Sequence, residues 1–515
     1  MPLSVTQFPL AGRGRQVLGL AALLLIAGLS LWRLTDYPTP WYDEGSHLHV
    51  PKTLLRYGQY ADYSSDGFRY YGPTIGVGPT VLLPIAAVFS VFGEGLFQAR
   101  LLIVVYLWAA LAAFYVLARR LGGAPLAWVA TALLLGTRGV ALLEYGRQVL
   151  GEVPGFFFVA AGLAVWLGAW ERPEGRRLAL AGGLLGLAVV TKSQYFIVLA
   201  PALAAGWVLN VVYYRTVPQR VFLVPGVLVG AFFALWQVTV VVLLGPGAVA
   251  DNLALYRAAT ASAATVFSPD LMERALRELL SLKVYLGWLV PILIYGAALS
   301  LPRTRDGQRW GVIFLVVVVN LVWYVVASVS WLRYAFVGLA LSSLFVARFF
   351  SDLTAGFQFD GRGLWMAWRQ TAADWPARAL RAAVGLWLAA MIALPLAQSA
   401  RPILLPPFNA PRAMADYLNT NVSPEALIET WEPELGFLTD HNYHFPPQAR
   451  LYQAVSYVWA GGPPPAQGYT FIQDAQPEYV LAGQFSKYVA FYPSEVLVEY
   501  QPVTEIGPYT LYHRR

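Results

Sequence analysis

Long apolar segments recur along most of this chain, and they restrict its fold more than any other feature does. About eleven of them approach the roughly 20 residues that cross a bilayer as a helix. They cover residues 17–34, 97–118, 124–142, 154–170, 178–191, 194–213, 221–244, 284–301, 310–329, 331–350 and 381–400. Composition agrees, because 57% of the 515 residues are hydrophobic and only 13% are charged. The sequence therefore predicts a mainly α, polytopic transmembrane helical bundle.

One further apolar segment decides the direction of these spans. Residues 79–93 form a short segment that contains Pro79 and Pro84, which suits an interfacial or re-entrant segment as well as a span. If it does not cross and the N-terminus is cytoplasmic, every short arginine-rich loop lies on the cytoplasmic side, as the positive-inside rule requires. A crossing there would turn all the later loops outward. We therefore predict that 79–93 does not cross the membrane.

The same topology leaves several segments outside the cytosol. They are the connections 35–96, 142–154, 191–194 and 245–283, and everything after about residue 401. The net charge of +7 is spread over short loops and forms no patch, which argues against nucleic acid as a partner. A short helix is also expected from "GSHLHVPKTLLRYG" within the first external loop, at the membrane surface.

The C-terminal region differs in character from the rest of the chain. A proline-rich stretch leads to a predicted short helix near 411–420 and to four strand-like pieces, "ALIETW", "EYVLAG", "EVLVEY" and "YTLYHR". We predict two domains, a transmembrane module over 1–400 and a small extracytoplasmic α+β domain over 401–515. The chain has no cysteine, so no disulfide stabilises the external domain.

The motif "WYDEGSHLHV" at 41–50 gathers ionisable groups directly after the first span. Asp43 and Glu44 are adjacent carboxylates, and solvated acids that cap a helix would give the same pattern. His47 lies four and three residues beyond them, so the three side chains share one helical side and are candidate ligands for a divalent metal ion.

Further ionisable residues fall on the same predicted side of the membrane. They are Arg138, Arg147, Glu152, Lys192 and Arg333. A charged residue beside an apolar segment is costly and marks a candidate functional site. Three of them also have a simpler explanation: Lys192 as a lysine reaching the interface from a helix end, Glu152 as a carboxylate at a helix start, and Arg333 as part of an aromatic and basic belt.

These motifs together resemble a known family. "WYDEGSHLHVPKTLLRYGQY", "VGPTVLLPIAAVFSVFGEGLFQARLL", "YVLARRLGG", "YGRQVLGEVPGFFF", "VVTKSQ" and "WLRYAFVGLAL" occur in order over about residues 36–350. They resemble the dolichyl-phosphate-mannose protein mannosyltransferase-like group of GT-C membrane glycosyltransferases, which includes the aminoarabinose transferases. The resemblance implies a GT-C helical bundle with an extracytoplasmic active site that uses a sugar on a polyprenyl monophosphate.

The resemblance also implies roles for residues. Asp43 falls on the family's catalytic acid position with Glu44 beside it, and Glu152 falls on a second conserved acidic segment together with Arg147. Lys192 matches the lysine of a Thr-Lys motif. Arg333 matches an Arg-Tyr motif. Two departures are Gly78-Pro79-Thr80, where relatives commonly have a polar residue before Pro-Pro, and Ser193, where many have glycine.

The predicted function is transfer of a sugar from a polyprenyl-phosphate carrier to a hydroxyl acceptor on a protein, lipid or glycan. Asp43 would act as the general base, and an oxocarbenium-like transition state with a single base favours inversion. The donor phosphate would be neutralised by cations, for which the candidates are Arg138, Arg147, Lys192 and Arg333. A metal ion at Asp43, Glu44 and His47 would share that task. Two other functions remain open, a flippase for a lipid-linked sugar and a surface-polysaccharide ligase or polymerase.

Overall fold

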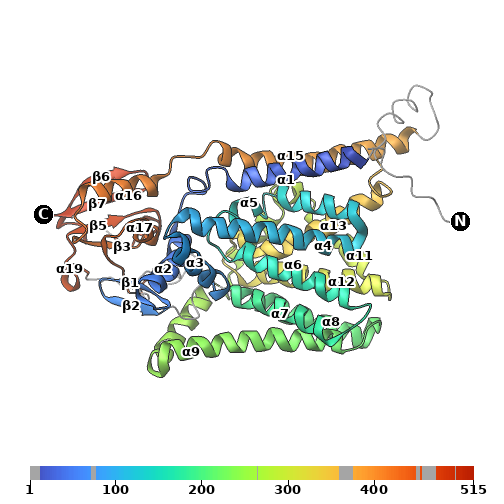
Figure 1. Ribbon diagram of the computed structural model, residues 1–515, viewed down its shortest axis with the longest axis horizontal. Helices are drawn as coiled ribbons and strands as arrows, with labels where there is room; N and C mark the ends of the chain where they lie inside the picture. The colour runs from blue at the N-terminus through green and yellow to red at the C-terminus, as the bar shows by residue number, and fades with distance from the viewer. Residues whose placement is uncertain are drawn as a thin grey trace.

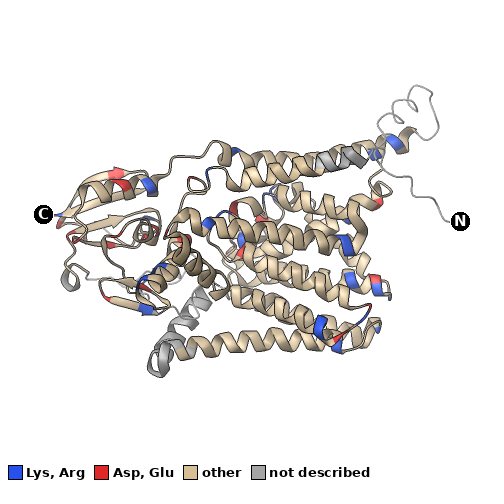
Figure 2. Ribbon diagram, viewed as in Figure 1, with Lys and Arg blue, Asp and Glu red and all other residues tan. Residues whose placement is uncertain are grey.

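A bundle of long helices and a smaller C-terminal domain at one end of it make up the molecule (Figure 1). The computed structural model describes residues 12–70, 77–263, 265–358, 375–447, 450, 453–454, 457, 471–492 and 494–515. Figure 2 shows that Lys, Arg, Asp and Glu gather near the two ends of the bundle and in the C-terminal domain, whereas the middle of the long helices carries other residues. This distribution is the one expected of helices whose middle sections lie in lipid.

Helices occupy all the predicted spans, and two of these spans lie within a single long helix. Its long elements are α1 (Gly12–Leu31), α4 (Leu96–Gly136), α6 (Glu152–Ala169), α7 (Gly175–Thr191), α8 (Gln194–Leu209), α9 (Arg220–Ala263), α11 (Leu289–Ser300), α12 (Arg305–Ala327), α13 (Phe336–Leu353) and α15 (Trp375–Leu404). Shorter elements connect them, namely α5 (Leu142–Tyr145), η1 (Asn210–Tyr214), α10 (Pro269–Leu279), η2 (Tyr285–Gly287) and η3 (Leu332–Ala335). The transmembrane bundle predicted from the sequence is therefore confirmed.

Seven of the described helices are long and apolar enough to cross a membrane. Helix α4, with 41 residues, joins two of the predicted spans, and its backbone leaves the helical conformation at Gly122 and Gly123. Gly123 has φ of +79°, which a residue without a side chain adopts at little cost. The chain is therefore an integral membrane protein whose 97–118 and 124–142 segments meet at a glycine kink.

The first external loop folds into α2 (Tyr42–Tyr57), the hairpin β1 (Ala61–Ser64) and β2 (Gly67–Tyr70), and α3 (Pro79–Phe92). Helix α3 has 14 residues, and at 1.5 Å per residue it is too short to cross a hydrocarbon core of about 30 Å. It packs against α2, α4 and α7. The segment predicted not to cross is thus a short helix attached to the end of the bundle.

The C-terminal domain is built on a five-stranded sheet in the order β4-β3-β5-β7-β6. Its elements are α16 (Ala410–Asn421), β3 (Leu427–Thr430), α17 (Pro433–Leu438), β4 (Asn442–His444), α19 (Phe471–Asp474), β5 (Tyr479–Ala482), α20 (Gln484–Tyr488), β6 (Tyr500–Ile506) and β7 (Tyr509–Arg514). β3 pairs in parallel with β4 and β5, whereas β7 pairs antiparallel with β5 and β6. The predicted α+β character is confirmed.

One predicted strand is wrong. The piece "EVLVEY" at 495–500 is a series of turns up to Glu499, with Leu497 N donating to Ser494 O and Tyr500 N to Leu497 O. A tight turn at Gly507 connects β6 to β7, so residues 500–506 pair with β7. The strand therefore begins at residue 500, where the predicted strand ends. The side chains of Val496 and Leu497 pack against a small apolar cluster that includes Phe471 and Tyr500.

Candidate active site

Helix α2 carries the acidic motif and presents its residues in different directions. It begins after Trp41, whose backbone is extended, and it ends at Gly58, whose φ of +71° closes the last turn. Asp43 and Glu44 lie in its first turn, where carboxylates are stabilised by the positive end of the helix dipole. Because neighbouring residues of an α-helix are rotated by about 100°, these two adjacent acids face different surroundings.

Asp43 forms an ion pair with Arg333. The distance from Arg333 Nη1 to Asp43 Oδ2 is 2.5 Å, and the side chains are 11% and 24% exposed. Arg333 comes from η3, which leads directly into α13. Its guanidinium carbon lies 5.3 Å from the ring centre of Trp41, 4.7 Å from that of Trp331 and 5.5 Å from that of Tyr334. The structure therefore joins two predicted site residues that are 290 positions apart in the sequence.

A second ion pair joins Glu152 and Lys192. Glu152 is the first residue of α6, and Lys192 follows the last residue of α7. Lys192 Nζ donates to Glu152 Oε1, and the two side chains are 10% and 3% exposed. The ammonium lies 5.7 Å from the ring centre of Tyr334, the same ring that borders Arg333. The charge of Arg333 also acts on Glu152, so the two pairs are neighbours.

His47 completes this group. It lies one turn beyond Asp43 on α2, and its Nδ1 hydrogen-bonds the backbone oxygen of Val149 at 2.8 Å, just before α6. Burial lowers the pKa of His47 below its usual 6.5, although the Asp43 and Glu152 carboxylates oppose that effect. The imidazole is therefore neutral at pH 7. We call Asp43, His47, Glu152, Lys192 and Arg333 the polar cluster.

Two buried atoms of the polar cluster have no hydrogen-bond partner among the described residues. They are Glu152 Oε2 and Arg333 Nε, one acceptor and one donor. Buried polar atoms are nearly always paired, and unpaired ones need an explanation such as a ligand or a functional role. The polar cluster thus offers both a cationic and an anionic contact to a molecule that enters it.

Gly78 and Thr80 hold the segment that carries Lys192. Gly78 N donates to Thr191 O at 2.8 Å, and Thr80 Oγ1 donates to Thr191 Oγ1 at 2.7 Å. A Cβ atom on Gly78 would overlap the backbone oxygen of Val190. The glycine therefore allows α3 to approach the end of α7, beside Lys192.

Glu44 does not join the polar cluster. It is fully buried and accepts hydrogen bonds from Arg100 Nε at 2.9 Å, Arg100 Nη2 at 2.5 Å and Val149 N at 3.0 Å. These contacts engage both carboxylate oxygens. The predicted catalytic role for Glu44 therefore receives no geometric support, because its side chain connects α2 to α4. Arg100 was missed in the sequence, although an arginine inside an apolar segment is the signal that should have revealed it.

Arg147 is also engaged elsewhere. Its guanidinium is fully buried and donates to the backbone oxygens after and at the end of α1, which are those of Leu29, Ser30, Trp32, Arg33 and Tyr37. The last carbonyls of a helix, here those of Leu29 and Ser30, have no partner within the helix, so a guanidinium satisfies them well. Its predicted phosphate contact is unsupported, because this geometry leaves no N–H for a phosphate.

Arg138 lies apart from the polar cluster as well. Its side chain is exposed, and Nη1 donates to Gln398 Oε1 of α15 at 3.2 Å. Its charge acts on Glu144 and Tyr37. The predicted donor-phosphate residues therefore separate into two that the structure brings together, Lys192 and Arg333, and two that lie elsewhere.

The predicted metal ligands are not assembled. Within the described part of the chain, no three carboxylate or imidazole groups come together to hold a metal ion. Glu44 is directed toward Arg100, and Asp43 already pairs with Arg333. The residues therefore do not fit the predicted site at Asp43, Glu44 and His47, and we derive no step through a metal.

Comparison with known proteins agrees with this architecture. The family model of dolichyl-phosphate-mannose-protein mannosyltransferases matches residues 77–242, which include Glu152 and Lys192. No curated protein sequence is significantly similar to the chain.

Solved structures extend the similarity to nearly the whole chain. ArnT from Cupriavidus metallidurans, bound to undecaprenyl phosphate, has a TM-score of 0.59 at 15% identity over 98% of both chains. The oligosaccharyltransferase of Archaeoglobus fulgidus in its apo form has a TM-score of 0.58 at 14% identity, over 96% of this chain and 74% of that one. The Archaeoglobus fulgidus oligosaccharyltransferase AglB, in complex with an inhibitory peptide and a dolichol-phosphate, has a TM-score of 0.56 at 14% identity, over 97% and 74%. The fold is therefore shared, and the predicted resemblance to GT-C membrane glycosyltransferases is confirmed.

Proposed function

We propose that the chain is an integral-membrane glycosyltransferase that moves a sugar from a polyprenyl-monophosphate carrier to a hydroxyl group of an acceptor. The observation that carries this proposal is the polar cluster, in which Arg333 and Lys192 converge beside Asp43 at helix ends. Buried cations at one end of a membrane bundle suit a phosphate held at the lipid surface. The family model and the shared fold support the same class of reaction.

Asp43 is the proposed general base. The acceptor oxygen attacks the anomeric carbon of the donor sugar while the bond from that carbon to the phosphate oxygen breaks. The hydroxyl proton passes to the Asp43 carboxylate, and the polyprenyl phosphate leaves with the bonding electron pair. A base within hydrogen-bond reach of the attacking hydroxyl is what this step requires. Attack on the face opposite the leaving phosphate gives inversion of the anomeric carbon.

Arg333 and Lys192 are the proposed partners of the donor phosphate. Both are paired with carboxylates, so a phosphate that enters would compete for the same N–H groups and free the Asp43 carboxylate for its task. The leaving phosphate gains negative charge as the bond breaks, and fixed cations in a water-poor site stabilise such charge most strongly. Arg333 Nε is a donor already buried without a partner.

Glu152 and His47 are proposed to orient groups rather than to exchange protons. Glu152 Oε1 holds the Lys192 ammonium, and its Oε2 is a buried acceptor that suits a hydroxyl of the sugar or of the acceptor. His47 is neutral and fixed by Val149, so its second ring nitrogen is another neutral hydrogen-bonding group. We leave Glu44, Arg138 and Arg147 out of the proposed mechanism.

The reaction is proposed to take place on the extracytoplasmic side of the plasma membrane. The positive-inside distribution of arginine-rich loops supports this orientation. A carrier lipid is the natural donor there, and the ArnT and AglB structures contain undecaprenyl phosphate and a dolichol-phosphate. The acceptor is proposed to be a hydroxyl group on a protein, a lipid or a glycan.

A donor panel tests this function. The purified protein in nanodiscs is mixed with polyprenyl monophosphates that carry different sugars, and with an envelope extract that supplies acceptors. We expect one donor to release free polyprenyl phosphate in step with sugar transfer to the extract. If no donor is consumed but one of them crosses the membrane of proteoliposomes that contain the protein, a flippase replaces the transferase.

A further inference from the structure

Helix α2 has a second contact face, opposite the one that carries Asp43 and His47. Gly45, His49, Lys52 and Arg56 recur at spacings of four, three and four, so they lie along one side of the helix. Asp43 and His47 lie on the other side, because successive residues turn by about 100°. The first side contacts residues 433–440 of the C-terminal domain along most of the length of α2.

Lys52 is the central contact on this face. Its side chain is almost fully buried, and Nζ donates to Gly436 O at 3.0 Å and to Thr439 O at 3.0 Å. The same ammonium forms an ion pair with Asp440 at 2.9 Å. Gly436 lies within α17 and Thr439 follows it, so a single cation from α2 satisfies carbonyls at the end of that helix.

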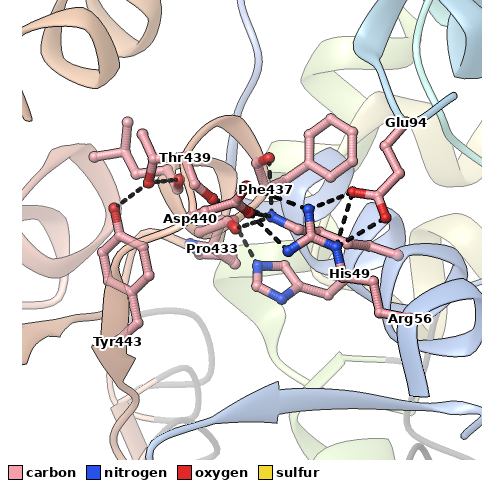
Figure 3. A network of polar contacts seen from close by, with 11 residues as sticks. His49, Arg56, Glu94, Pro433, Phe437, Thr439, Asp440 and Tyr443 are labelled. Carbon is pink, nitrogen blue, oxygen red and sulfur yellow. Dashed lines mark hydrogen bonds and ion pairs between the residues drawn. The ribbon is translucent and has the colours of Figure 1, made fainter. Parts of the chain in front are cut away.

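His49 and Arg56, one turn to either side of Lys52, also connect α2 to the C-terminal domain (Figure 3). His49 Nε2 hydrogen-bonds Pro433 O at 2.9 Å, one turn earlier on α2. Arg56 binds Glu94, directly before α4, at 2.6 Å and Asp440 at 2.9 Å, one turn later. The C-terminal domain, α2 and the start of α4 are therefore joined by one continuous polar network.

Two glycines bring the backbones into direct contact. A Cβ atom on Gly45 would overlap the backbone of Glu434, and a Cβ on Gly436 would lie 2.8 Å from the His49 ring. Neither element can move along the other without breaking these contacts. Gly45 is only two residues from Asp43, so this contact lies within one helical turn of the residue that carries the carboxylate.

We propose that the C-terminal domain positions the Asp43 carboxylate for catalysis and that Lys52 is the positioning residue through which it does so. This inference rests on the proposed transferase function of Asp43. On its other flank α2 is anchored to the bundle by Glu44 and Arg100, so the helix is held between the bundle and the domain. A displacement of a reacting group by about 1 Å costs on the order of 100-fold in rate, which makes such support consequential.

The test is Lys52→Met in the full-length protein, which keeps the length of the side chain and removes its charge. We expect kcat to fall about 100-fold while KM for the donor changes little, since the phosphate contacts are untouched. Amide hydrogen exchange of residues 42–50 and 433–440 should rise. Lys283→Met is the matched control, because Lys283 is a half-exposed lysine paired with Glu278, and both measurements should stay at wild-type values.

A second pair of variants separates positioning from general damage. If Lys52 acts through Asp43, Lys52→Met should have no further effect on the residual rate in an Asp43→Asn background. A full additional 100-fold loss in that background overturns the proposal. The proposal is also overturned if Lys52→Met has the wild-type kcat although amide hydrogen exchange at residues 433–440 is raised. The exchange measurement needs no substrate: unchanged exchange at 42–50 in Lys52→Met refutes the positioning role, whereas absence of transfer by the wild type refutes the proposed function.

Discussion

At the scale of single residues, the adjacent acids Asp43 and Glu44 have separate surroundings. Asp43 pairs with Arg333 near the surface of the bundle, and Glu44 pairs with Arg100 in its interior. The sequence placed both in one catalytic motif because adjacency says nothing about direction. One step along a helix turns the side chain by about 100°, and that turn separates a candidate base from a structural anchor.

This difference predicts unequal effects of two similar substitutions on stability. Glu44→Gln leaves the Arg100 guanidinium buried without its counter-charge, and breaking a buried pair in this way costs about 3–5 kcal/mol. We expect a large drop in the thermal midpoint of the purified protein. Asp43→Asn at the partly exposed pair should change the midpoint far less. Equal midpoints for Glu44→Gln and wild type would contradict the anchoring role.

Other residues show where sequence reasoning reaches its limit. The sequence alone nominated Asp43, Glu152, Lys192 and Arg333 because charged groups beside apolar segments are rare and costly. It nominated Arg147 for the same reason. The partners of Arg147 are backbone carbonyls at the end of α1, and no pattern of side chains reveals such a contact.

At the scale of elements, the membrane helices were predictable and some details of the small domain were not. Apolar length alone located the spans, since a bilayer imposes it. The strand predicted at 495–500 is wrong because the turn at Gly507 makes residues 500–506 pair with β7. The alternation of side chains along a segment does not reveal which strand it pairs with. The contacts between α2 and α17 connect residues almost 400 positions apart and were likewise invisible.

The contact between α2 and α17 should depend on pH through His49. Burial lowers the pKa of His49 to about 4 from its usual 6.5. The unfolded chain therefore binds a proton at this residue at a higher pH than the folded chain does, so the contribution of His49 to stability is complete above about pH 6.5 and falls toward pH 4. The thermal midpoint should fall over this range, and less steeply in His49→Gln, whose amide can still donate to Pro433.

His444 provides a control of opposite sign. Burial opposes its protonation, but the hydrogen bond and charge of Glu429 and the charge of Asp66 together raise the pKa of His444 above 6.5. Its contribution to stability is therefore present below pH 6.5 and is lost as the pH rises through the folded-state pKa. His444→Gln should therefore leave the fall toward pH 4 unchanged and should lack the loss of stability that the wild type shows as the pH rises above about 6.5. An undiminished loss above pH 6.5 in His444→Gln would contradict this assignment.

At the scale of the whole molecule, the bundle and the C-terminal domain act as one unit around α2. The bundle supplies Glu152, Lys192 and Arg333 to the polar cluster. The C-terminal domain contacts the face of α2 opposite the one that carries Asp43. This arrangement supports the role in the reaction that we propose for the C-terminal domain, although none of its residues belongs to the polar cluster.

The orientation of the molecule is directly testable because the chain has no cysteine. We expect Glu495→Cys, on the surface of the C-terminal domain, to react with a membrane-impermeant maleimide in intact cells. Gly175→Cys lies at the exposed start of α7, where an added side chain meets no neighbour, and it should react only after the membrane is permeabilised. The reverse pattern would contradict the predicted topology and the extracytoplasmic site.

The central claim is that Asp43 acts in the chemical step of sugar transfer. The most direct measurement compares wild type with Asp43→Asn, using the donor that the panel identifies, in single-turnover transfer and in donor binding. General bases contribute about 100- to 10,000-fold to a rate. We therefore predict that transfer falls by that amount while the dissociation constant for the donor stays within a few fold. Transfer at the wild-type rate by Asp43→Asn would contradict the account.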